Sequence, residues 1–378
     1  MANYNFEDLT AFIDGIGEKY GVPGSDCIIT ENGRIIYRHS AGYSDLENKV
    51  PVSPEDTHWI YSASKLFTVV AAQKLISEGK IDPEAPVGRY IPEFSEMTVK
   101  QADGSIAPAQ NTMLVKHLLT MTGGLNYDLA TPQLNALKEA NPEYTTLDFA
   151  KALASQPLDF EPGTHFRYSL CLDVIGAIIE IASGMSFEEY LRQNICEPLG
   201  LKNTSFHPTE SMMAHCVQQY SQETGETELT HKDNGLVPSP NLESGGAGLM
   251  STLDDYSTFA AALSLGGISA DGVRIIDEDA LKCMCIPRLG AQELVDYHVF
   301  KPEFYRYSYG FGVRTLVNND DSPWPLGLFG WDGAAGAFVS VDPERKISVC
   351  YFQQVLRSQR TFKEVHQELI LKAYECMR

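Results

Sequence analysis

Segments typical of β-strands lie near both ends of the chain, and the long stretch between them lacks such segments. Near the N-terminus, two short strands are predicted on either side of Asn32-Gly33, a dipeptide that favours a tight hairpin turn. Near the C-terminus, residues 310–354 contain further predicted strands. Between residues 82 and 204, proline and glycine separate segments whose apolar residues have helical spacing. Because an isolated strand pair is barely stable, we expect one sheet assembled from both ends, with a helical region inserted.

The expected sheet domain comprises residues 1–80 and 205–378, and the expected helical domain comprises residues 81–204. Helices are predicted at residues 6–20, 62–78, 115–121, 146–154, 170–183, 186–196, 254–265 and 360–377. Strands are predicted at residues 26–30, 34–39, 310–316, 326–331, 336–341 and 348–354. The two terminal helices are expected to cover the sheet.

The chain is strongly acidic, with a net charge of −21 over 378 residues. Such a charge repels nucleic acids and anionic membranes, because both bind proteins through lysine and arginine. No stretch approaches the roughly 18 uninterrupted apolar residues that a membrane helix needs, and the N-terminus does not resemble a secretory signal. We therefore expect no nucleic-acid partner, no membrane span and a cytoplasmic location. The eight cysteines form no Cys-x-x-Cys pair, which favours reduced, buried thiols.

Two Ser-x-x-Lys tetrads are present, and their surroundings differ. Ser77 and Lys80 lie on either side of Gly79, where a helix is expected to end, so a solvated helix terminus explains them. Ser62 instead begins a predicted helix, and Lys65 shares a helix face with it because the two residues are three positions apart. The chain has no Gly-x-Ser-x-Gly, no phosphate-binding loop and no His-Glu-x-x-His.

A serine hydroxyl is a poor nucleophile until a base removes its proton. Lys65 can serve as that base if burial and neighbouring cations lower its pKa enough to leave it neutral. The helix N-terminus adds positive potential near the Ser62 oxygen, which favours developing negative charge there. The tetrad alone leaves an alternative open, in which Ser62 is only a helix N-cap.

Other segments, in their order along the chain, resemble the serine β-lactamase and penicillin-binding-protein family. The resemblance is to its class C-like branch, which includes the family VIII carboxylesterases and related transesterases. The matching segments are IYSASKLFT (60–68), VKHLLTMTGGL (115–125), EPGTHFRYS (161–169) with DVIG (173–176), PLGL (198–201) with NT (203–204), GGAGLMST (245–252) and FGWDGAAG (329–336). Each segment is weak evidence alone, and together they span about 275 residues in the family's order.

The resemblance implies an α/β (α+β) fold of the β-lactamase/transpeptidase type. A mainly antiparallel sheet is flanked by the terminal helices, and an all-helical region is added to it. By position in the motifs, Ser62 matches the nucleophile, Lys65 its helix partner and Tyr168 the tyrosine of the second motif. The backbone amides of Ser62 and Ala334 match the oxyanion hole. No metal and no organic cofactor are implied, and the partner is a small-molecule ester or amide substrate.

Four positions that the resemblance assigns to substrate binding are Leu170, Trp331, Asp332 and Gly333. Leu170 replaces the asparagine of the second β-lactamase motif, and Trp331 and Asp332 replace the lysine and the threonine or serine of the third. We expect Asp332 to repel an anionic β-lactam, and these departures favour the esterase branch. The predicted activity is therefore ester hydrolysis or acyl transfer through an acyl-Ser62 intermediate, with Lys65 as proton relay together with the motif tyrosine. The alternatives are a β-lactamase or D-alanyl-D-alanine carboxypeptidase and, less favoured, a non-catalytic binding protein.

Overall fold

The computed structural model describes residues 4–320 and 322–378. The strands are β1 (Gly24–Glu31), β2 (Arg34–Asp45), β3 (Val50–Pro51), β4 (Thr57–Trp59), β5 (Thr98–Lys100), β6 (Ile106–Pro108), β7 (Tyr220–Ser221), β8 (Glu228–Leu229), β9 (Met250–Thr252), β10 (Tyr307–Tyr309), β11 (Arg314–Leu316), β12 (Phe329–Asp332), β13 (Phe338–Asp342), β14 (Ile347–Phe352) and β15 (Val355–Leu356).

The helices are α1 (Glu7–Tyr20), α2 (Ser64–Ser77), α3 (Val115–Leu119), α4 (Pro132–Ala140), α5 (Thr146–Ala154), α6 (Cys171–Ser183), α7 (Phe187–Leu191), α8 (Glu197–Leu199), α9 (Glu210–Ala214), α10 (Leu253–Ser264), α11 (Glu278–Cys285), α12 (Ala291–Phe300) and α13 (His366–Cys376). The short 3-10 or π segments are η1 (Tyr61–Ala63), η2 (Val87–Arg89), η3 (Pro92–Ser95), η4 (Arg192–Cys196), η5 (Pro302–Phe304) and η6 (Thr361–Val365).

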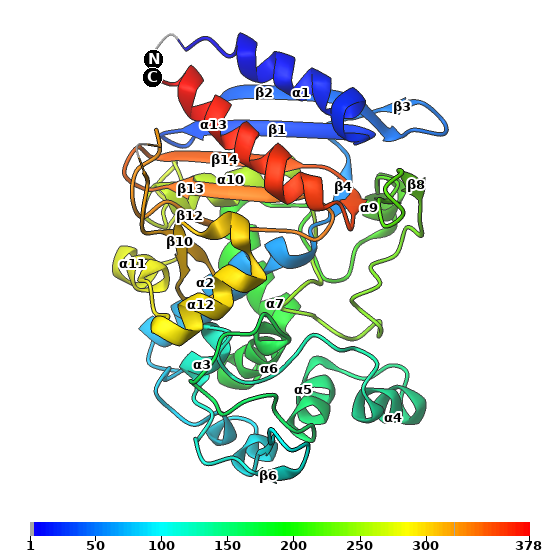
Figure 1. Cartoon of the computed structure of the whole chain (residues 1–378). Coiled ribbons are helices and arrows are strands. Elements are labelled where there is room, and N and C mark those ends of the chain that lie inside the picture. Colours follow the sequence, from blue (N-terminus) through cyan, green and yellow to red (C-terminus); the bar gives the residue numbers. More distant parts are fainter. Residues whose placement is uncertain (1–3, 321) are drawn as a thin grey trace.

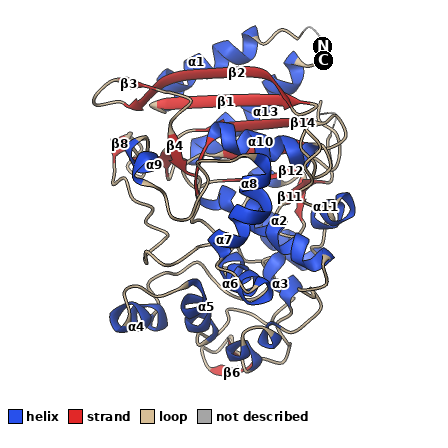
Figure 2. Cartoon of the chain, turned by 180° about the vertical axis from the view of Figure 1, so that it is seen from behind, coloured by secondary structure: helices blue, strands red, loops and turns tan. Residues whose placement is uncertain are grey.

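One eight-stranded sheet joins the two ends of the chain, in the order β10-β11-β12-β13-β14-β1-β2-β3. Its ladders are antiparallel, and β1 pairs with β14 from Asp26 opposite Phe352 to Glu31 opposite Ile347. Helices α1 and α13 lie together on one face of the sheet, with the two termini side by side (Figure 1). Helix α10 covers the opposite face (Figure 2). The expected mainly antiparallel sheet flanked by terminal helices is confirmed.

The Asn32-Gly33 turn connects β1 to β2 as predicted. Both residues have positive φ angles, 50° and 76°, which suit the right-handed twist of a two-residue hairpin. The interior of β1 is buried on both faces, because α1 packs on one side and α10 on the other. Burial on both faces is consistent with the consecutive apolar residues Cys27, Ile28 and Ile29 at the centre of the strand, and the buried polar residues beside them are hydrogen-bonded.

Two expectations about local structure are wrong. Only the last three residues of the strand predicted at residues 310–316 form a strand, because β10 already ends at Tyr309 and β11 begins at Arg314. Gly312 lies in the intervening turn with φ 68°, a conformation that glycine adopts without strain. The region expected to be all helical contains a short hairpin, β5 paired with β6. Helices α4, α11 and α12 were not predicted.

Helix α2 is the central element of the molecule. It lies between the sheet and the helical region and packs against α6 (Figure 1). Its first ten residues, from Ser64 to Gln73, are all buried, including the Lys65 side chain. A lysine in this position needs polar partners inside the protein, because it has no access to water. Among the residues described, no helix has both the length and the apolar character needed to cross a membrane.

Candidate active site

Ser62 lies in η1, the tight turn that leads into α2. The preceding residue, Tyr61, has φ 46°, a left-handed conformation that is strained for a residue with a side chain. The Tyr61 hydroxyl donates a 2.5 Å hydrogen bond to Gln219, which holds the strained turn from one side. Ala63 occupies the N-cap of α2, and no side-chain cap is formed there. The alternative in which Ser62 is only an N-cap is therefore not supported.

Lys65 is fully buried and its ammonium nitrogen points back to the turn. Nζ donates to the Ser62 Oγ at 3.3 Å and to the main-chain oxygen of Gly246 at 2.6 Å. The same nitrogen lies 4.7 Å from the centre of the Tyr168 ring and 5.5 Å from the centre of the Tyr127 ring. Aromatic faces attract a cation at these distances. The structure thus brings Ser62, Lys65 and Tyr168 together from three separate sequence motifs.

Tyr168 is held between other aromatic rings. Its ring stacks on Phe300 of α12 with centroids 4.9 Å apart, and on Tyr127 with centroids 5.6 Å apart. Trp331 of β12 also stacks on it, and the indole Nε1 donates to the Tyr168 hydroxyl oxygen at 3.2 Å. These contacts fix the position of the tyrosine beside Lys65.

Tyr127 and Phe300 also belong to the site, and the sequence motifs did not identify them. Tyr127 follows the matching segment at residues 115–125. Burial raises the pKa of Tyr127 well above its usual value, so its phenol stays protonated. Its ring is an aromatic neighbour of the Lys65 ammonium group. No local pattern around either residue marks it as part of the site, because both reach Tyr168 only through the fold.

The end of β12 lies directly against the residues before Ser62. A side chain at Gly333 would place its Cβ only 2.3 Å from the main-chain oxygen of Ile60. Gly333 is therefore a close-packing position, where a larger residue would push β12 away from η1. The amides of Ser62 and Ala334 donate no hydrogen bond within residues 4–320 and 322–378. Two unpaired amides on adjoining segments are what an oxyanion hole requires.

The structure gives the remaining predicted binding residues different positions. Leu170 is 3% exposed and precedes α6 as part of the main core. Trp331 is also 3% exposed and forms the wall behind Tyr168. Neither presents much surface to a solvent-filled pocket, so the expected substrate contacts of Leu170 in particular are not supported by this arrangement.

Asp332 is turned away from Tyr168 and is paired inside the protein. Its Oδ1 accepts a 2.6 Å hydrogen bond from Arg314, and His366 Nδ1 lies 3.9 Å from Oδ2. Burial alone would raise the pKa of Asp332, but Arg314 and His366 lower it to about 2. The expectation that Asp332 repels an anionic substrate is therefore wrong, because Arg314 balances its charge.

Cys171 is the cysteine nearest the site in sequence, and its environment disfavours a thiolate. Burial raises the pKa of the Cys171 thiol to about 11, and its sulfur accepts a 3.1 Å hydrogen bond from Ser169. In the described part of the chain, no group of three or more His, Cys, Asp or Glu side chains is arranged to hold a metal ion. The chemistry that this arrangement can support is nucleophilic attack by the Ser62 oxygen.

Comparison with known proteins identifies the family. The Beta-lactamase family model matches residues 9–372. The acyltransferase calJ of Penicillium decumbens is 28% identical over 351 residues, covering 85% of this chain and 82% of that protein. Esterase EstB of Burkholderia gladioli is 31% identical over 216 residues, covering 53% of this chain and 52% of that protein.

A solved structure matches almost the whole chain. It is that of EstCE1, described as a hydrolase with promiscuous acyltransferase activity, which superposes with a TM-score of 0.78 and 25% sequence identity. The match covers 97% of each chain. The family match, the shared fold and the serine–lysine–tyrosine arrangement agree with one another, and the chain belongs to the beta-lactamase family.

Proposed function

We propose that this protein hydrolyses carboxylic esters, or transfers their acyl group, through a covalent acyl-Ser62 intermediate. The observation that carries the proposal is the 3.3 Å contact between Lys65 Nζ and Ser62 Oγ in a buried corner beside Tyr168. A fully buried lysine directed at a serine oxygen has little structural purpose, because burying an ammonium is costly. A binding protein on the same fold would need neither group.

In the proposed reaction, Ser62 Oγ attacks the carbonyl carbon of the ester. Its proton passes to the Lys65–Tyr168 relay, and the carbonyl oxygen becomes an oxyanion that accepts hydrogen bonds from the amides of Ser62 and Ala334. The tetrahedral intermediate then collapses, the relay returns the proton to the departing alkoxide, and an alcohol leaves. A water molecule repeats the sequence on the acyl carbon and regenerates Ser62. A second alcohol in place of water gives acyl transfer.

An ester substrate is favoured over a β-lactam. In the third motif, Trp331 occupies the position of the lysine that helps β-lactamases to hold a substrate carboxylate, and its indole donates to Tyr168 instead. A neutral ester does not need the missing cation. The printed names of EstB and calJ, an esterase and an acyltransferase, support the same choice.

The test is labelling with a fluorophosphonate, followed by intact-mass and peptide mass spectrometry. We expect one adduct, on Ser62, and none in Ser62→Ala. The matched control is Ser77→Ala, since Ser77 belongs to the second Ser-x-x-Lys tetrad and donates only to the main-chain oxygen of Lys74. Labelling that survives in Ser62→Ala, or that disappears in Ser77→Ala, would contradict the assignment of the nucleophile.

A further inference from the structure

A second buried charge lies behind Lys65. Asp173, in the first turn of α6, is 1% exposed. Its Oδ1 accepts hydrogen bonds from the Ser244 hydroxyl at 2.5 Å and from the Gly246 amide at 3.3 Å. Its Oδ2 has no hydrogen-bond partner in the part of the chain that the structure describes. A buried carboxylate with an unpaired oxygen is costly unless a nearby positive charge stabilises it.

Two glycines allow this carboxylate to approach. A Cβ on Gly246 would lie 2.5 Å from the Asp173 Oδ2, and a Cβ on Gly245 would lie 2.5 Å from the main-chain oxygen of Leu172. Any other residue at these positions would force the segment away from the start of α6. Glycine is therefore required here for close packing of the segment against Asp173.

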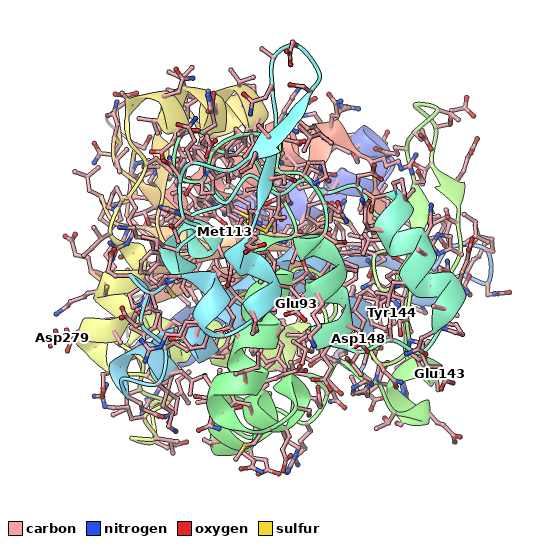
Figure 3. The ribbon with its side chains drawn as sticks, turned by 90° about the horizontal axis from the view of Figure 1, so that it is seen from below. Glu93, Met113, Glu143, Tyr144, Asp148 and Asp279 are labelled. Carbon is pink, nitrogen blue, oxygen red and sulfur yellow. The ribbon has the colours of Figure 1, made fainter. Side chains whose placement is uncertain are left out.

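The segment that carries Gly246 is anchored from its other end. The Ser239 hydroxyl donates to the main-chain oxygen of Tyr144 at 2.7 Å, and the Asn241 amide donates to that of Glu143 at 2.9 Å. Tyr144 and Glu143 lie together beside α5 on the underside of the molecule (Figure 3). The segment before Gly246 is thus held by the loop that precedes α5, and Gly246 itself contacts Asp173 of α6.

Gly246 connects the two buried charges. Its amide donates to Asp173, and its main-chain oxygen accepts the 2.6 Å hydrogen bond from Lys65. We propose that Asp173 is a positioning residue that keeps Lys65 as an ammonium ion directed at Ser62. This inference rests on the proposed function of Ser62. The carboxylate supplies the compensating charge without contacting Nζ, so the ammonium remains free to bind the serine oxygen.

The other titratable groups that face this pair are Tyr127, Cys171 and Tyr168. Burial keeps Tyr127 and Cys171 protonated and neutral by raising their pKa values. Tyr168, whose ring lies beside the ammonium, is then the member of the relay that accepts the Ser62 proton. Burial also raises the pKa of Asp173, whereas Lys65 opposes that rise. All contacts of Lys65 Nζ are to acceptors, namely Ser62 Oγ, a main-chain oxygen and two aromatic faces. Such surroundings suit an ammonium, which only donates.

This role predicts a direction for the pH dependence. A nearby carboxylate stabilises the ammonium, so removing the carboxylate lets Lys65 lose its proton at lower pH. If the reaction needs the ammonium, the alkaline limb of the pH–rate profile then moves to lower pH. If the reaction instead needs neutral lysine as the base, the same change extends activity to lower pH. The two possibilities are distinguished by which limb moves.

The experiment compares wild type with Asp173→Asn, using p-nitrophenyl butyrate between pH 5 and pH 10. The asparagine keeps the size of the side chain and an oxygen that accepts from Ser244, and it removes the charge. We expect kcat/KM to fall about 10- to 100-fold, as when a group that orients a functional residue is lost. We also expect the alkaline limb to move to lower pH by about one unit or more.

Two further variants separate charge from structure. Ser244→Ala removes one hydrogen bond and keeps the carboxylate, so its profile should keep the wild-type limbs even if its rate is lower. Asp342→Asn removes a buried carboxylate that binds Tyr374 on the far side of the sheet, and it should leave the profile unchanged. If Asp173→Asn does not fold, Ser244→Ala still tests the proposal, because a displaced alkaline limb in that variant would overturn it.

The proposed role of Asp173 would be overturned if the pH–rate profile of Asp173→Asn had the same limbs as that of wild type. It would also be overturned if this variant remained active at lower pH than wild type. Both results require an active wild-type enzyme with a labelled Ser62. A wild type that hydrolyses no ester and takes up no fluorophosphonate would instead contradict the proposed function. The two failures are therefore distinguishable in one set of measurements.

Discussion

Two buried pairs of opposite charge in the described part of the chain differ in their geometry. Arg314 and Asp332 are 2% and 6% exposed at their side chains and are joined by a direct 2.6 Å hydrogen bond. Lys65 and Asp173 are buried as deeply, but they are linked only through Gly246. The first pair connects neighbouring strands β11 and β12, and the second lies between helices α2 and α6.

The difference shows two situations for a buried cation: it can be paired directly with a carboxylate, or it can remain able to bind another group. Arg314 is buried and also donates to the main-chain oxygen of Val339, so it is not available to a substrate in solvent. Lys65 has a compensating carboxylate, Asp173, to which it is linked only through Gly246. Its ammonium group can therefore donate a proton to the Ser62 oxygen. Successive residues of β12 serve both regions, because Trp331 faces Tyr168 and Asp332 faces Arg314.

Removing the Tyr168 hydroxyl should have the largest effect on activity. Loss of a well-placed acid or base typically costs about 100- to 10,000-fold, and we expect Tyr168→Phe to lower kcat by that factor. Stability should change little, because the ring contacts with Phe300 and Trp331 remain. Steady-state kinetics with a neutral ester measure the effect. Trp331→Phe, which removes the indole donor and makes the stacking ring smaller, should show a smaller loss. A near-normal kcat in Tyr168→Phe would remove this residue from the relay.

Disrupting the Arg314–Asp332 pair should lower the stability of the protein and leave ester hydrolysis unchanged. Arg314→Met leaves the Asp332 carboxylate buried without its partner, which typically costs about 3–5 kcal/mol of the free energy of unfolding. Urea denaturation measures this loss. Replacing both residues together, as in Arg314→Met with Asp332→Leu, should recover much of it. If Arg314→Met keeps the wild-type stability and loses ester hydrolysis, the assignment of a structural role to this pair and a role in the reaction to Lys65 and Asp173 is contradicted.

Local pattern was enough to predict several parts of the fold. The helix at residues 146–154 was predicted with the bounds that α5 has, because a threonine cap and a clear apolar face mark it. The Asn32-Gly33 hairpin and the sheet formed from both ends also follow from turn chemistry and segment order. Ser62 and Lys65 were predicted from the Ser-x-x-Lys tetrad together with the order of the family's other motifs, and in the structure their side chains are 3.3 Å apart.

Other features depend on contacts between distant segments, which no local pattern records. The partner of Asp332 depends on the register of β11 against β12, in which Arg314 lies opposite Gly330. The sequence places an aspartate in the third motif but says nothing about the face it occupies. Tyr127 reaches the site only through the packing of the helical region against α2. Helix α12 escaped prediction although its last residue, Phe300, stacks on Tyr168.

The substrate preference should follow the missing lysine of the third motif. Charge-assisted hydrogen bonds contribute on the order of 1.5–3 kcal/mol, equivalent to about 10- to 150-fold in rate. We expect kcat/KM for p-nitrophenyl butyrate to exceed that for benzylpenicillin by at least this factor, since Arg314 is occupied by Asp332 and does not replace the lost cation. The measurement is the ratio of the two values in wild type. A ratio that favours benzylpenicillin would support the β-lactamase alternative.

Lowering the pH should weaken the Arg314–Asp332 pair over a pH range that the pKa of Asp332 predicts. The pKa of Asp332 is lowered from 3.8 to about 2, so the folded state binds this proton less readily than the unfolded state. The stabilisation, about 2 kcal/mol, is present above the unfolded pKa and is lost as the pH falls from about 4 to about 2. Urea unfolding at a series of pH values measures it. In Asp332→Asn the slope of stability against pH in this range should be shallower, and an identical slope would contradict the lowered pKa.

The smallest expected effect comes from Cys171, which lies three residues after Tyr168 without taking part in the reaction. Its thiol is fully buried, its pKa is raised to about 11, and its sulfur accepts a hydrogen bond from Ser169. Cys171→Ala should therefore keep kcat/KM within about threefold, with a modest loss of stability from the small cavity. Iodoacetamide should modify the partly exposed Cys283 before Cys171 and should leave ester hydrolysis intact. Loss of activity in a folded Cys171→Ala would mean that the thiol, and not only the Lys65–Asp173 pair, controls the site.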